Sequence, residues 1–302
     1  MQTNHKYDVM IIGGGPAGLS AAMVLGRCRR KVILFDAHKQ RNRFSDAMNG
    51  FITRDGTKPA EFIELARQEL TKYKVDLCAA SVKKVRHFKN GFEAEDESGE
   101  KFSARKLLLA TGLKDILPEL EGIDNFYGKS VHHCPYCDGW ESRDKAIGAY
   151  GKNRQGVGLA LSLKTWSPQV TLFTDGTNRL TPEDREKLQR NDIHIVTKKI
   201  TRLEGKDTKL QKLVLEDGAT EQCEALFFST GTDQQAVLAQ MLGCEFTSRG
   251  VVKTRKLQKT NIKGLFVAGD AARDVQLVIV AAAEGTKAAV AINMELQEED
   301  RK

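Results

Sequence analysis

The sequence lacks the features that would indicate a membrane protein or a nucleic-acid-binding protein. It has no apolar run of membrane-spanning length, and no basic leader with an apolar segment precedes its first predicted strand. Its 47 Lys and Arg residues exceed its 40 Asp and Glu residues, giving a net charge of +7, but no basic stripe stands apart from the acids. We therefore expect a cytoplasmic protein with no membrane or nucleic-acid partner. The positive charge is expected to be an ordinary solvated surface, and docking of an acidic protein partner is the alternative.

Cysteine is also scarce, with six residues in 302. Four are scattered singly and are expected to be buried apolar side chains: Cys28, Cys78, Cys223 and Cys244. The other two stand close together. In a cytoplasmic protein such a pair is expected to cycle between the thiol and disulfide states and not to form a permanent structural disulfide.

This pair lies in residues 132–139, HHCPYCDG. Two intervening residues allow Cys134 and Cys137 to form a disulfide, and a turn or helix N-terminus at this point would lower a thiol pKa toward neutrality. Asp138 is placed to exchange protons with the leaving thiolate. The alternative is half of a zinc site, but the second pair of ligands that such a site needs is missing nearby. The motif therefore favours a redox disulfide and no metal.

The chain is long enough for two domains, and its 40% hydrophobic and 29% charged content is ordinary for a globular protein. Residues 7–12 predict a strand, and an Ala- and Leu-rich stretch to about residue 26 predicts a helix. Between them, Gly13, Gly15 and Gly18 fit the G-x-G-x-x-G fingerprint, in which the backbone approaches a pyrophosphate at a helix N-terminus. A second strand at 31–35 ends in Asp36, at the spacing typical of an acid that binds an adenosine ribose rather than one that merely caps a strand.

The next segments complete this first pattern. Residues 41–56 are polar and rich in turns, which predicts a loop that folds over a ligand. Pro59 opens an amphipathic helix, and from residue 81 the sequence alternates as an antiparallel meander with turns at 90–91 and 98–99. The meander leads to a buried strand at 107–109, followed by the sequence ATG at 110–112.

Much of this pattern recurs after a linker at 113–122. A strand at 146–150, a turn at 151–156, a helix at 157–166 and a strand at 170–174 are predicted in that order. Thr181 caps a further helix, and the sequence LFFSTG at 226–231 echoes residues 107–112. The chain thus carries two versions of one nucleotide-binding plan. A last strand at 265–270 and a long helix at 275–292, which contains Gln276, return to the first domain.

In order and spacing these motifs resemble the low-molecular-weight thioredoxin reductases, and the likeness covers nearly the whole chain. The motifs are GGGPAG at 13–18, ATG at 110–112, CPYCDG at 134–139, and AGD at 268–270 with Gln276. The resemblance implies an α/β fold with two Rossmann-like (three-layer ββα) nucleotide-binding domains, the second inserted into the first. Residues 1–116 and 244–302 would form a discontinuous FAD-binding domain, and residues 117–243 a pyridine-nucleotide-type domain that carries the cysteine pair. It also implies a homodimer.

The family's site residues carry over onto matching positions. The resemblance implies an FAD site made of Gly13, Gly14, Gly15, Pro16, Ala17, Asp36, Asn49, Val82, Thr111, Gly112, Gly269, Asp270 and Gln276. Asp270 and Gln276 would meet the ribityl chain and the isoalloxazine ring. Cys137 would lie next to the flavin, Cys134 would attack the substrate, and Asp138 would act as the acid-base group.

Three departures from the reductase pattern concern the electron donor and the substrate. Asn153 stands where the second fingerprint should have its middle glycine. Asp175 lies where the reductases carry a His-Arg-Arg cluster for the 2′-phosphate of NADPH, and an acid there would repel that phosphate and suit a ribose diol. The stretch at 48–56 and the pair Trp140-Glu141 resemble a branch that includes small-molecule dithiol oxidases. NADH and NADPH both stay open as donors.

The resulting prediction is an FAD-dependent thiol-disulfide oxidoreductase that passes electrons between flavin and the Cys134/Cys137 pair. Its partner would be a thioredoxin-like protein or a small-molecule disulfide or dithiol. One alternative is a dithiol oxidase with oxygen as the acceptor, and another is a thioredoxin reductase-like protein that needs no pyridine nucleotide. A third is a non-catalytic redox sensor that binds FAD.

Overall fold

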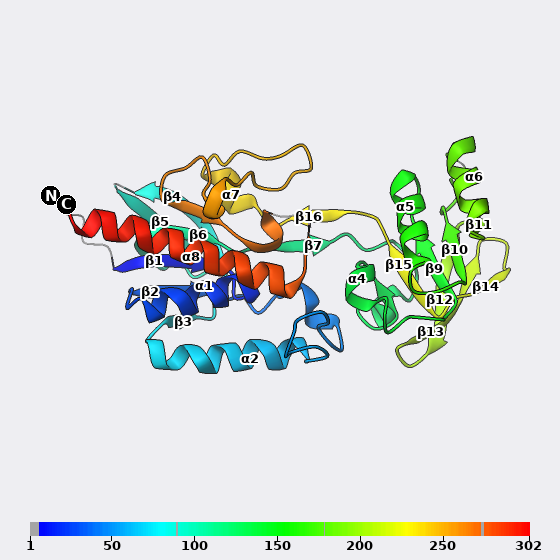
Figure 1. Cartoon of the computed structure of the whole chain (residues 1–302), viewed down its shortest axis with the longest axis horizontal. Helices are drawn as coiled ribbons and strands as arrows, with labels where there is room; N and C mark the ends of the chain where they lie inside the picture. The colour runs from blue at the N-terminus through cyan, green and yellow to red at the C-terminus, as the bar shows by residue number, and fades with distance from the viewer. Residues whose placement is uncertain (1–5, 89, 178, 273–274) are drawn as a thin grey trace. The chain divides into compact units, whose positions relative to one another are not determined.

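The computed structural model describes residues 6–88, 90–177, 179–272 and 275–302. The chain divides into two compact units, coloured along the sequence in Figure 1. Unit 1 contains Met1–Arg43, Thr57–Lys114 and Asp233–Lys302, and unit 2 contains Phe44–Gly56 and Asp115–Thr232. The predicted domain limits differ at three segments, because residues 44–56 and 115–116 group with unit 2 and residues 233–243 with unit 1.

A seven-stranded sheet with the order β3-β2-β1-β6-β5-β4, and with β17 beside β6, forms the centre of unit 1. Its strands are β1 (Tyr7–Ile12), β2 (Val32–Phe35), β3 (Asp76–Cys78), β4 (Val82–Phe88), β5 (Gly91–Asp96), β6 (Lys101–Leu109) and β17 (Leu265–Val267). The long strand β6 has two sets of neighbours. Its first half is antiparallel to β5, with Phe102 opposite Ala94, and its second half is parallel to β1 and β17. The predicted meander and the predicted strand at 107–109 are therefore parts of one sheet.

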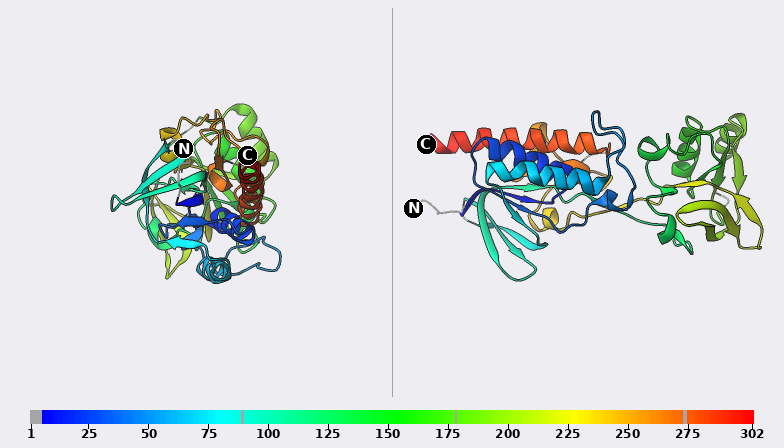
Figure 2. Two further views of the ribbon diagram at one scale, coloured as in Figure 1. Left: turned by 90° about the vertical axis from the view of Figure 1, so that its left-hand side faces the viewer. Right: turned by 90° about the horizontal axis from the view of Figure 1, so that it is seen from below.

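Helices cover one face of the parallel strands of this sheet, and the antiparallel strands of the meander pack against their other face (Figure 2). The helices are α1 (Pro16–Arg27), α2 (Pro59–Leu70) and α8 (Val278–Asp300), and their apolar residues share one core with Val9, Ile11 and Leu108. The opposite core joins the meander, the short helix α7 (Val237–Met241) and the other side of the same strands. Unit 1 thus has the three layers that were predicted, and its short helices are η1 (Arg41–Phe44), η2 (Thr71–Tyr73), η3 (Lys256–Gln258) and η4 (Gly269–Ala271).

Unit 2 repeats this layering around a five-stranded parallel sheet with the order β11-β10-β9-β15-β8. The strands are β8 (Val131–His132), β9 (Ile147–Tyr150), β10 (Val170–Phe173), β11 (His194–Val196) and β15 (Ala225–Phe228). Helices α5 (Arg154–Leu163) and α6 (Pro182–Arg190) share one core with the sheet. An antiparallel sheet of β12 (Ile200–Lys206), β13 (Lys209–Leu215) and β14 (Thr220–Gln222) contributes to the other core.

Four short elements complete the description: α3 (Ile123–Phe126), α4 (Pro135–Asp138), β7 (Leu113–Asp115) and β16 (Thr232–Gln234). Strands β7 and β16 pair with each other where the chain passes from one unit to the other. None of the helices in the described part of the chain is long and apolar enough to cross a membrane.

Several predicted boundaries were wrong for identifiable reasons. Helix α8 begins at Val278, so Gln276 precedes the helix instead of lying along it, and the helix continues to Asp300. Residues 293–300 are mostly polar helix formers, with Met294 and Leu296 as the two apolar residues, so the apolar pattern that defined the prediction ended too early. Helix α5 begins at Arg154, three residues before its predicted start, because the side chain of Asn153 caps it. The predicted cap of α6 is confirmed, since Thr181 accepts a 3.1 Å hydrogen bond from the Asp184 N–H.

The prediction that all four single cysteines are buried was also wrong. Cys223 and Cys244 are buried, but Cys28 is exposed and Cys78 is intermediate. Cys28 is the C-cap of α1, a position at a helix end where the chain turns toward solvent. Burial raises the pKa of the Cys223 thiol to about 12 and that of Cys244 to about 11, so both stay protonated and unreactive near neutral pH.

Candidate active site

The two cysteines of the predicted redox motif are joined by a disulfide, with their Cα atoms 5.3 Å apart. Cys134 is the N-cap of the single-turn helix α4, and Pro135 is its first residue, a position where the missing N–H of proline costs no hydrogen bond. The N–H groups of Cys137 and Asp138 donate to the Cys134 carbonyl at 3.1 and 3.2 Å. The local turn alone therefore brings the sulfurs together and places Asp138 beside them.

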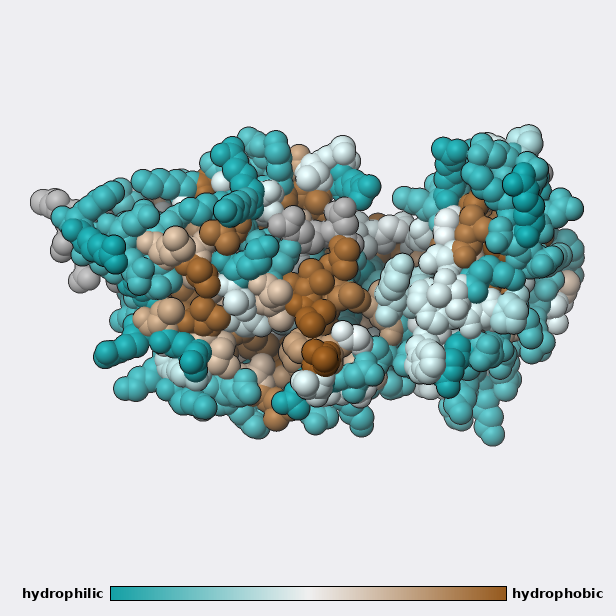
Figure 3. Space-filling model, viewed as in Figure 1, coloured by the Kyte–Doolittle hydropathy of each residue, from teal (hydrophilic) through white to brown (hydrophobic). Residues whose placement is uncertain are grey.

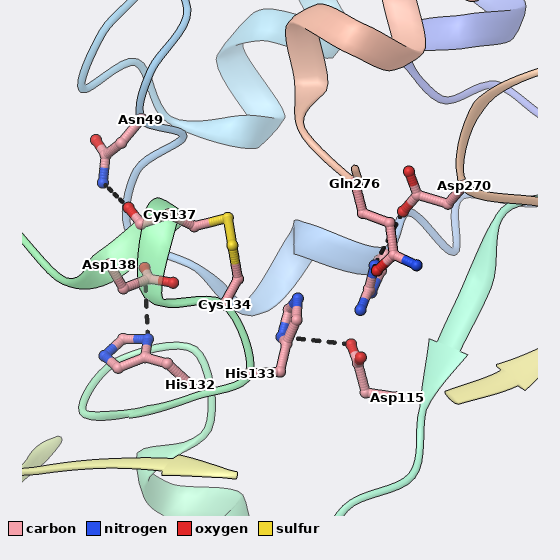
Figure 4. Close-up of a disulfide and its surroundings, with 10 residues drawn as sticks. Asn49, Asp115, His132, His133, Cys134, Cys137, Asp138, Asp270 and Gln276 are labelled. Atoms are coloured by element: carbon pink, nitrogen blue, oxygen red, sulfur yellow. Dashed lines mark hydrogen bonds and ion pairs between the residues drawn. A yellow bond between two sulfur atoms is a disulfide. The ribbon is translucent and has the colours of Figure 1, made fainter. Parts of the chain in front are cut away.

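Two histidines that precede the disulfide face two carboxylates (Figure 4). His132 Nδ1 lies 3.4 Å from Asp138 Oδ1, and His133 Nδ1 lies 3.5 Å from Asp115 Oδ2. Asp115 also accepts a 2.8 Å hydrogen bond from the Tyr127 hydroxyl. The predicted acid-base residue is thus paired with an imidazole, a partner that sequence reasoning missed although both histidines stand in the motif. Among the residues that the structure describes, no group of three or more His, Cys, Asp or Glu side chains is placed to hold a metal ion.

Asn49 belongs to the same unit as the redox pair. Its Nδ2 donates a 2.9 Å hydrogen bond to the carbonyl of Cys137 (Figure 4). The surrounding loop is fixed internally, because Asp55 accepts a 2.8 Å hydrogen bond from the Gly50 N–H. Asn49 therefore holds the C-terminal half of the redox turn, and its predicted contact with the cofactor stays a prediction.

The glycine-rich turn of unit 1 uses its glycines in two ways. A Cβ on Gly13 would lie 2.1 Å from the Ala110 carbonyl oxygen, and a Cβ on Gly18 would lie 1.9 Å from the Gly13 carbonyl oxygen, so packing excludes a side chain at both. Gly15 has φ −84° and ψ −176°, which any residue adopts, and a Cβ there would meet nothing within 4 Å. Neither backbone conformation nor packing therefore requires a glycine at position 15. The space beside Gly15 is open at the N-terminus of α1, where a pyrophosphate would approach.

Other predicted cofactor residues gather at this turn. A Cβ on Gly13 would lie 3.2 Å from the Thr111 backbone nitrogen, and a Cβ on Gly269 would lie 3.1 Å from the Ala17 Cβ. Gly112 has φ +67° and open space around its Cβ position. The end of β6, the start of α1 and the turn after β17 therefore meet at one edge of the sheet, the edge where open α/β sheets bind ligands.

Asp36 lies directly after β2 and is buried. A Cβ on Gly14 would lie 2.1 Å from the Asp36 carboxyl carbon, so this acid is held beside the glycine turn. Its oxygens accept hydrogen bonds from the Gln40 amide at 3.0 Å and the His38 N–H at 2.8 Å, and Arg67 forms an ion pair with it. The acid is thus oriented within unit 1, as a ribose-binding carboxylate needs to be.

Asp270 and Gln276 are joined by an arginine that sequence reasoning did not single out. Arg41 Nη1 donates to Asp270 Oδ2 at 3.0 Å and to Gln276 Oε1 at 2.6 Å. The buried carboxylate of Glu284 accepts a 2.9 Å hydrogen bond from the Gly269 N–H and ties this turn to α8. Arg41 lies in a polar loop without periodicity, and its two partners are 229 and 235 positions away, so no local pattern pointed to it.

Unit 2 repeats the glycine turn with a different middle residue. A Cβ on Gly156 would lie 2.4 Å from the Gly151 carbonyl oxygen, so the outer glycines are again required by packing. The middle position is Asn153, whose Oδ1 accepts a 2.9 Å hydrogen bond from the Gln155 N–H. The side-chain oxygen of Asn153 therefore occupies a backbone N–H at the start of α5. That N–H is one of the groups that would otherwise face a phosphate.

Asp175 lies two residues after the end of β10 in unit 2, one position further from its strand than Asp36 lies from β2 in unit 1. Its Oδ2 accepts a 2.6 Å hydrogen bond from the Tyr150 hydroxyl and lies 2.9 Å from Lys152 Nζ. Burial opposes ionisation, but the hydrogen bonds from Tyr150 and Lys152 outweigh it and hold the pKa of Asp175 below its ordinary value. Burial and the nearby carboxylate raise the pKa of Tyr150 in turn.

A family model described as pyridine nucleotide-disulphide oxidoreductase matches residues 7–285. The chain belongs to this family. A protein of Arthroderma benhamiae named probable thioredoxin reductase is 31% identical, over 98% of this chain and 81% of that protein. The crystal structure of HlmI superposes with a TM-score of 0.94 at 33% identity, covering 99% of this chain and 95% of HlmI. The putative thioredoxin reductase TrxB from Bacillus anthracis gives a TM-score of 0.92 at 33% identity, covering 97% and 99% of the two chains.

These likenesses confirm the predicted fold class and the predicted oxidoreductase function. The chain is an FAD-dependent disulfide oxidoreductase of the thioredoxin reductase type, and the family implies FAD and NAD(P)H as cofactors. The residues of unit 1 fit FAD, because Gly15 is open and the buried acid Asp36 lies beside the same turn. Val82 lies at the start of β4 and packs against the core of unit 1, so its own contact with FAD stays a prediction.

Proposed function

We propose that Cys134 and Cys137 are the redox pair through which this enzyme passes electrons between FAD and a disulfide or dithiol. The observation that carries the proposal is the disulfide closed within one helical turn that also holds Asp138. FAD, when bound, supplies the two-electron chemistry. Cys134 attacks the substrate sulfur, Cys137 resolves the mixed disulfide, and Asp138 exchanges the proton.

Unit 1 is proposed as the FAD-binding part and unit 2 as the pyridine-nucleotide part. In unit 1 the glycine turn would hold the pyrophosphate and Asp36 the adenosine ribose. Asp270 and Gln276 would meet the ribityl chain and the isoalloxazine ring, and their shared contact with Arg41 would keep them oriented.

NADH is the proposed donor. The support is the ionised Asp175 at the end of the second strand of unit 2, where a 2′-phosphate would be repelled and a ribose diol would find an acceptor. A thioredoxin-like protein or a small-molecule disulfide is the proposed acceptor, because relatives that cover most of this chain are named thioredoxin reductases.

A cytoplasmic homodimer is the proposed state of the enzyme. The exposed apolar side chains of α8, Val290 and Met294, stand one turn apart, and Val275 precedes the helix. Brown residues lie along the part of the surface in Figure 3 where Figure 1 places α8. An exposed apolar strip of this kind suits burial against a second copy of the chain, and sedimentation at several concentrations tests it.

The decisive experiment compares wild type with Cys134→Ser under anaerobic conditions. Wild type should take up about one two-electron equivalent of reductant more than the variant, since the variant cannot form the disulfide. The variant should also show a long-wavelength charge-transfer band between the Cys137 thiolate and flavin. Stoichiometric zinc, with disulfide turnover unaffected by either cysteine substitution, would contradict the assignment. Oxygen uptake driven by a dithiol, with no reduction by a pyridine nucleotide, would make the enzyme a dithiol oxidase.

A further inference from the structure

His132 occupies the end of β8, directly before the residues that lead into the redox turn. Its side chain is buried, and its ring lies 5.2 Å from the ring of Phe227 on the neighbouring strand β15, in register with it. Nδ1 lies 3.4 Å from Asp138 Oδ1. Figure 4 shows the two adjacent histidines pointing to different carboxylates, His132 to Asp138 and His133 to Asp115.

This arrangement fixes His132 from two sides. The strand holds its backbone, the ring of Phe227 packs beside the imidazole, and the carboxylate of Asp138 on the redox turn faces Nδ1. Asp138 is held in turn by its own N–H, which donates to the Cys134 carbonyl at 3.2 Å. The sheet of unit 2 thus orients the carboxyl group through a side chain, at a point where a single-turn helix alone gives little rigidity.

We propose that His132 is a positioning residue that holds Asp138 as the proton donor for thiol-disulfide exchange. The assignment rests on the proposed function of the cysteine pair. With its proton on Nδ1, the imidazole faces Oδ1 and stabilises the carboxylate that Asp138 becomes after it gives up its proton. The other carboxyl oxygen stays available to the leaving sulfur.

The Cys134 thiolate attacks one sulfur of the substrate disulfide, the S–S bond breaks, and the outgoing sulfur takes the electron pair and the proton of the Asp138 carboxyl group. Cys137 then gives its proton to the Asp138 carboxylate and, as the thiolate, attacks the sulfur of Cys134. The second substrate sulfur leaves with the electron pair of the broken S–S bond and takes that proton from Asp138. The products are the Cys134–Cys137 disulfide, two substrate thiols and the Asp138 carboxylate facing His132.

A general acid matters only when the leaving thiolate is basic. Aliphatic thiols have a pKa of about 8.5 and gain from a positioned proton, whereas an acidic aromatic thiolate leaves without one. A purely structural role of His132 would change both kinds of exchange to the same extent. Comparing the exchange rates with an aliphatic and an aromatic disulfide therefore distinguishes a role of His132 in positioning Asp138 from a role in folding.

The experiment mixes dithionite-reduced holoenzyme anaerobically with 2-hydroxyethyl disulfide or with 5,5′-dithiobis(2-nitrobenzoate) and follows a single exchange. His132→Leu should slow the aliphatic reaction about 10-fold and Asp138→Asn on the order of 100-fold, with the aromatic reaction within about 2-fold of wild type in both. His132→Asn should recover most of the aliphatic rate, because its Nδ2 replaces the N–H of the ring. The double variant His132→Leu with Asp138→Asn should be no slower than Asp138→Asn alone.

Thermal unfolding of each variant shows whether it is folded. Equal slowing of both reactions by His132→Leu, no slowing of either, or an additive effect in the double variant would overturn the assignment of His132 while leaving the redox pair intact. Reduced wild type that exchanges with neither disulfide would overturn the proposed function, and this assignment with it.

Discussion

The glycine turns of the two units differ at one position, and that difference separates the demands of folding from those of binding. In both turns the outer glycines are required by packing, since a Cβ on Gly13 or on Gly156 would overlap a backbone carbonyl oxygen. The middle residue is Gly15 in unit 1 and Asn153 in unit 2. Because nothing in the folded chain requires a glycine at position 15, its absent side chain is best explained by a ligand.

The acids that follow the second strands extend the comparison. Asp36, the acid proposed to bind ribose, interacts with the side chains of Gln40 and Arg67 beside an open glycine turn. Asp175 is bound by Tyr150 and by Lys152, and Lys152 is itself a residue of the second glycine turn. In unit 1 the acid and the turn are linked through Gln40, whose amide donates both to Asp36 and to the Gly14 carbonyl at 3.3 Å. In unit 2 the link is a charged side chain of the turn itself, so a dinucleotide there has to compete with an ion pair inside the protein.

The largest expected effect is on FAD binding through the turn of unit 1. Gly15→Leu should weaken FAD binding on the order of 100-fold, because the side chain would fill the space needed for close backbone approach, while the fold tolerates it. Flavin content after purification and FAD titration by fluorescence measure the loss. The matched control is Asn153→Leu, at the middle of the other turn, which should keep full flavin. A folded Gly15→Leu protein that retains its flavin would show that the comparison of the two turns is wrong.

Sequence patterns were sufficient for the parts of the molecule that depend on neighbours along the chain. The glycine turn, the redox turn and the capping box of α6 are all local features. Each could be predicted because the residues that form it lie within six positions of one another. Both sheets were anticipated because buried parallel strands read as continuous apolar runs.

The partners of the site residues were not predictable in the same way. Arg41 reaches Asp270 from 229 positions away and Arg67 reaches Asp36 from 31. Arg41 lies in a polar loop, and the amphipathic pattern of α2 predicts the helix that contains Arg67 but not the partner of its side chain. The grouping of residues 44–56 with unit 2 was missed for the same reason, since a polar loop reveals its packing only through contacts such as Asn49 with Cys137. Polar contacts of long sequence separation depend on the assembled fold.

The second prediction concerns the donor. Asp175→Asn should raise kcat/KM for NADPH relative to NADH by roughly 5-fold, which corresponds to about 1 kcal/mol of removed repulsion at a partly buried site. Anaerobic stopped-flow reduction of the flavin by each nucleotide measures this ratio. Asp36→Asn, reconstituted with FAD, is the control, because the acid that follows β2 in unit 1 should affect FAD retention and leave the ratio unchanged. Wild type that is reduced rapidly by NADPH and poorly by NADH would contradict the role given to Asp175.

A smaller effect is expected at the middle of the second turn. Asn153→Gly should lower the KM for NADH about 3-fold, since the backbone N–H groups at the start of α5 become accessible to a pyrophosphate. The lost cap should cost only a few tenths of a kcal/mol, because glycine is itself an acceptable N-cap residue. Asn153→Ala removes the cap and introduces a residue that is a poor N-cap, so it should lower the free energy of unfolding by about 1 kcal/mol. It should not lower the KM for NADH. An unchanged KM in Asn153→Gly would mean that the turn does not meet the nucleotide.

The smallest expected effect is a dependence of donor preference on pH. Because Asp175 is held below its ordinary pKa, it is ionised throughout pH 5.5 to 8, and its charge cannot change over about this range. A phosphate monoester loses its second proton near pH 6, so the 2′-phosphate of NADPH goes from one negative charge toward two as the pH rises. The preference for NADH should therefore grow by roughly 2-fold between pH 5.5 and 8, and the growth should be weaker in Asp175→Asn. Flavin reduction rates at subsaturating nucleotide across this range give the ratio directly. A preference for NADH that falls with rising pH, or that grows equally in Asp175→Asn, would mean that another group sets the discrimination.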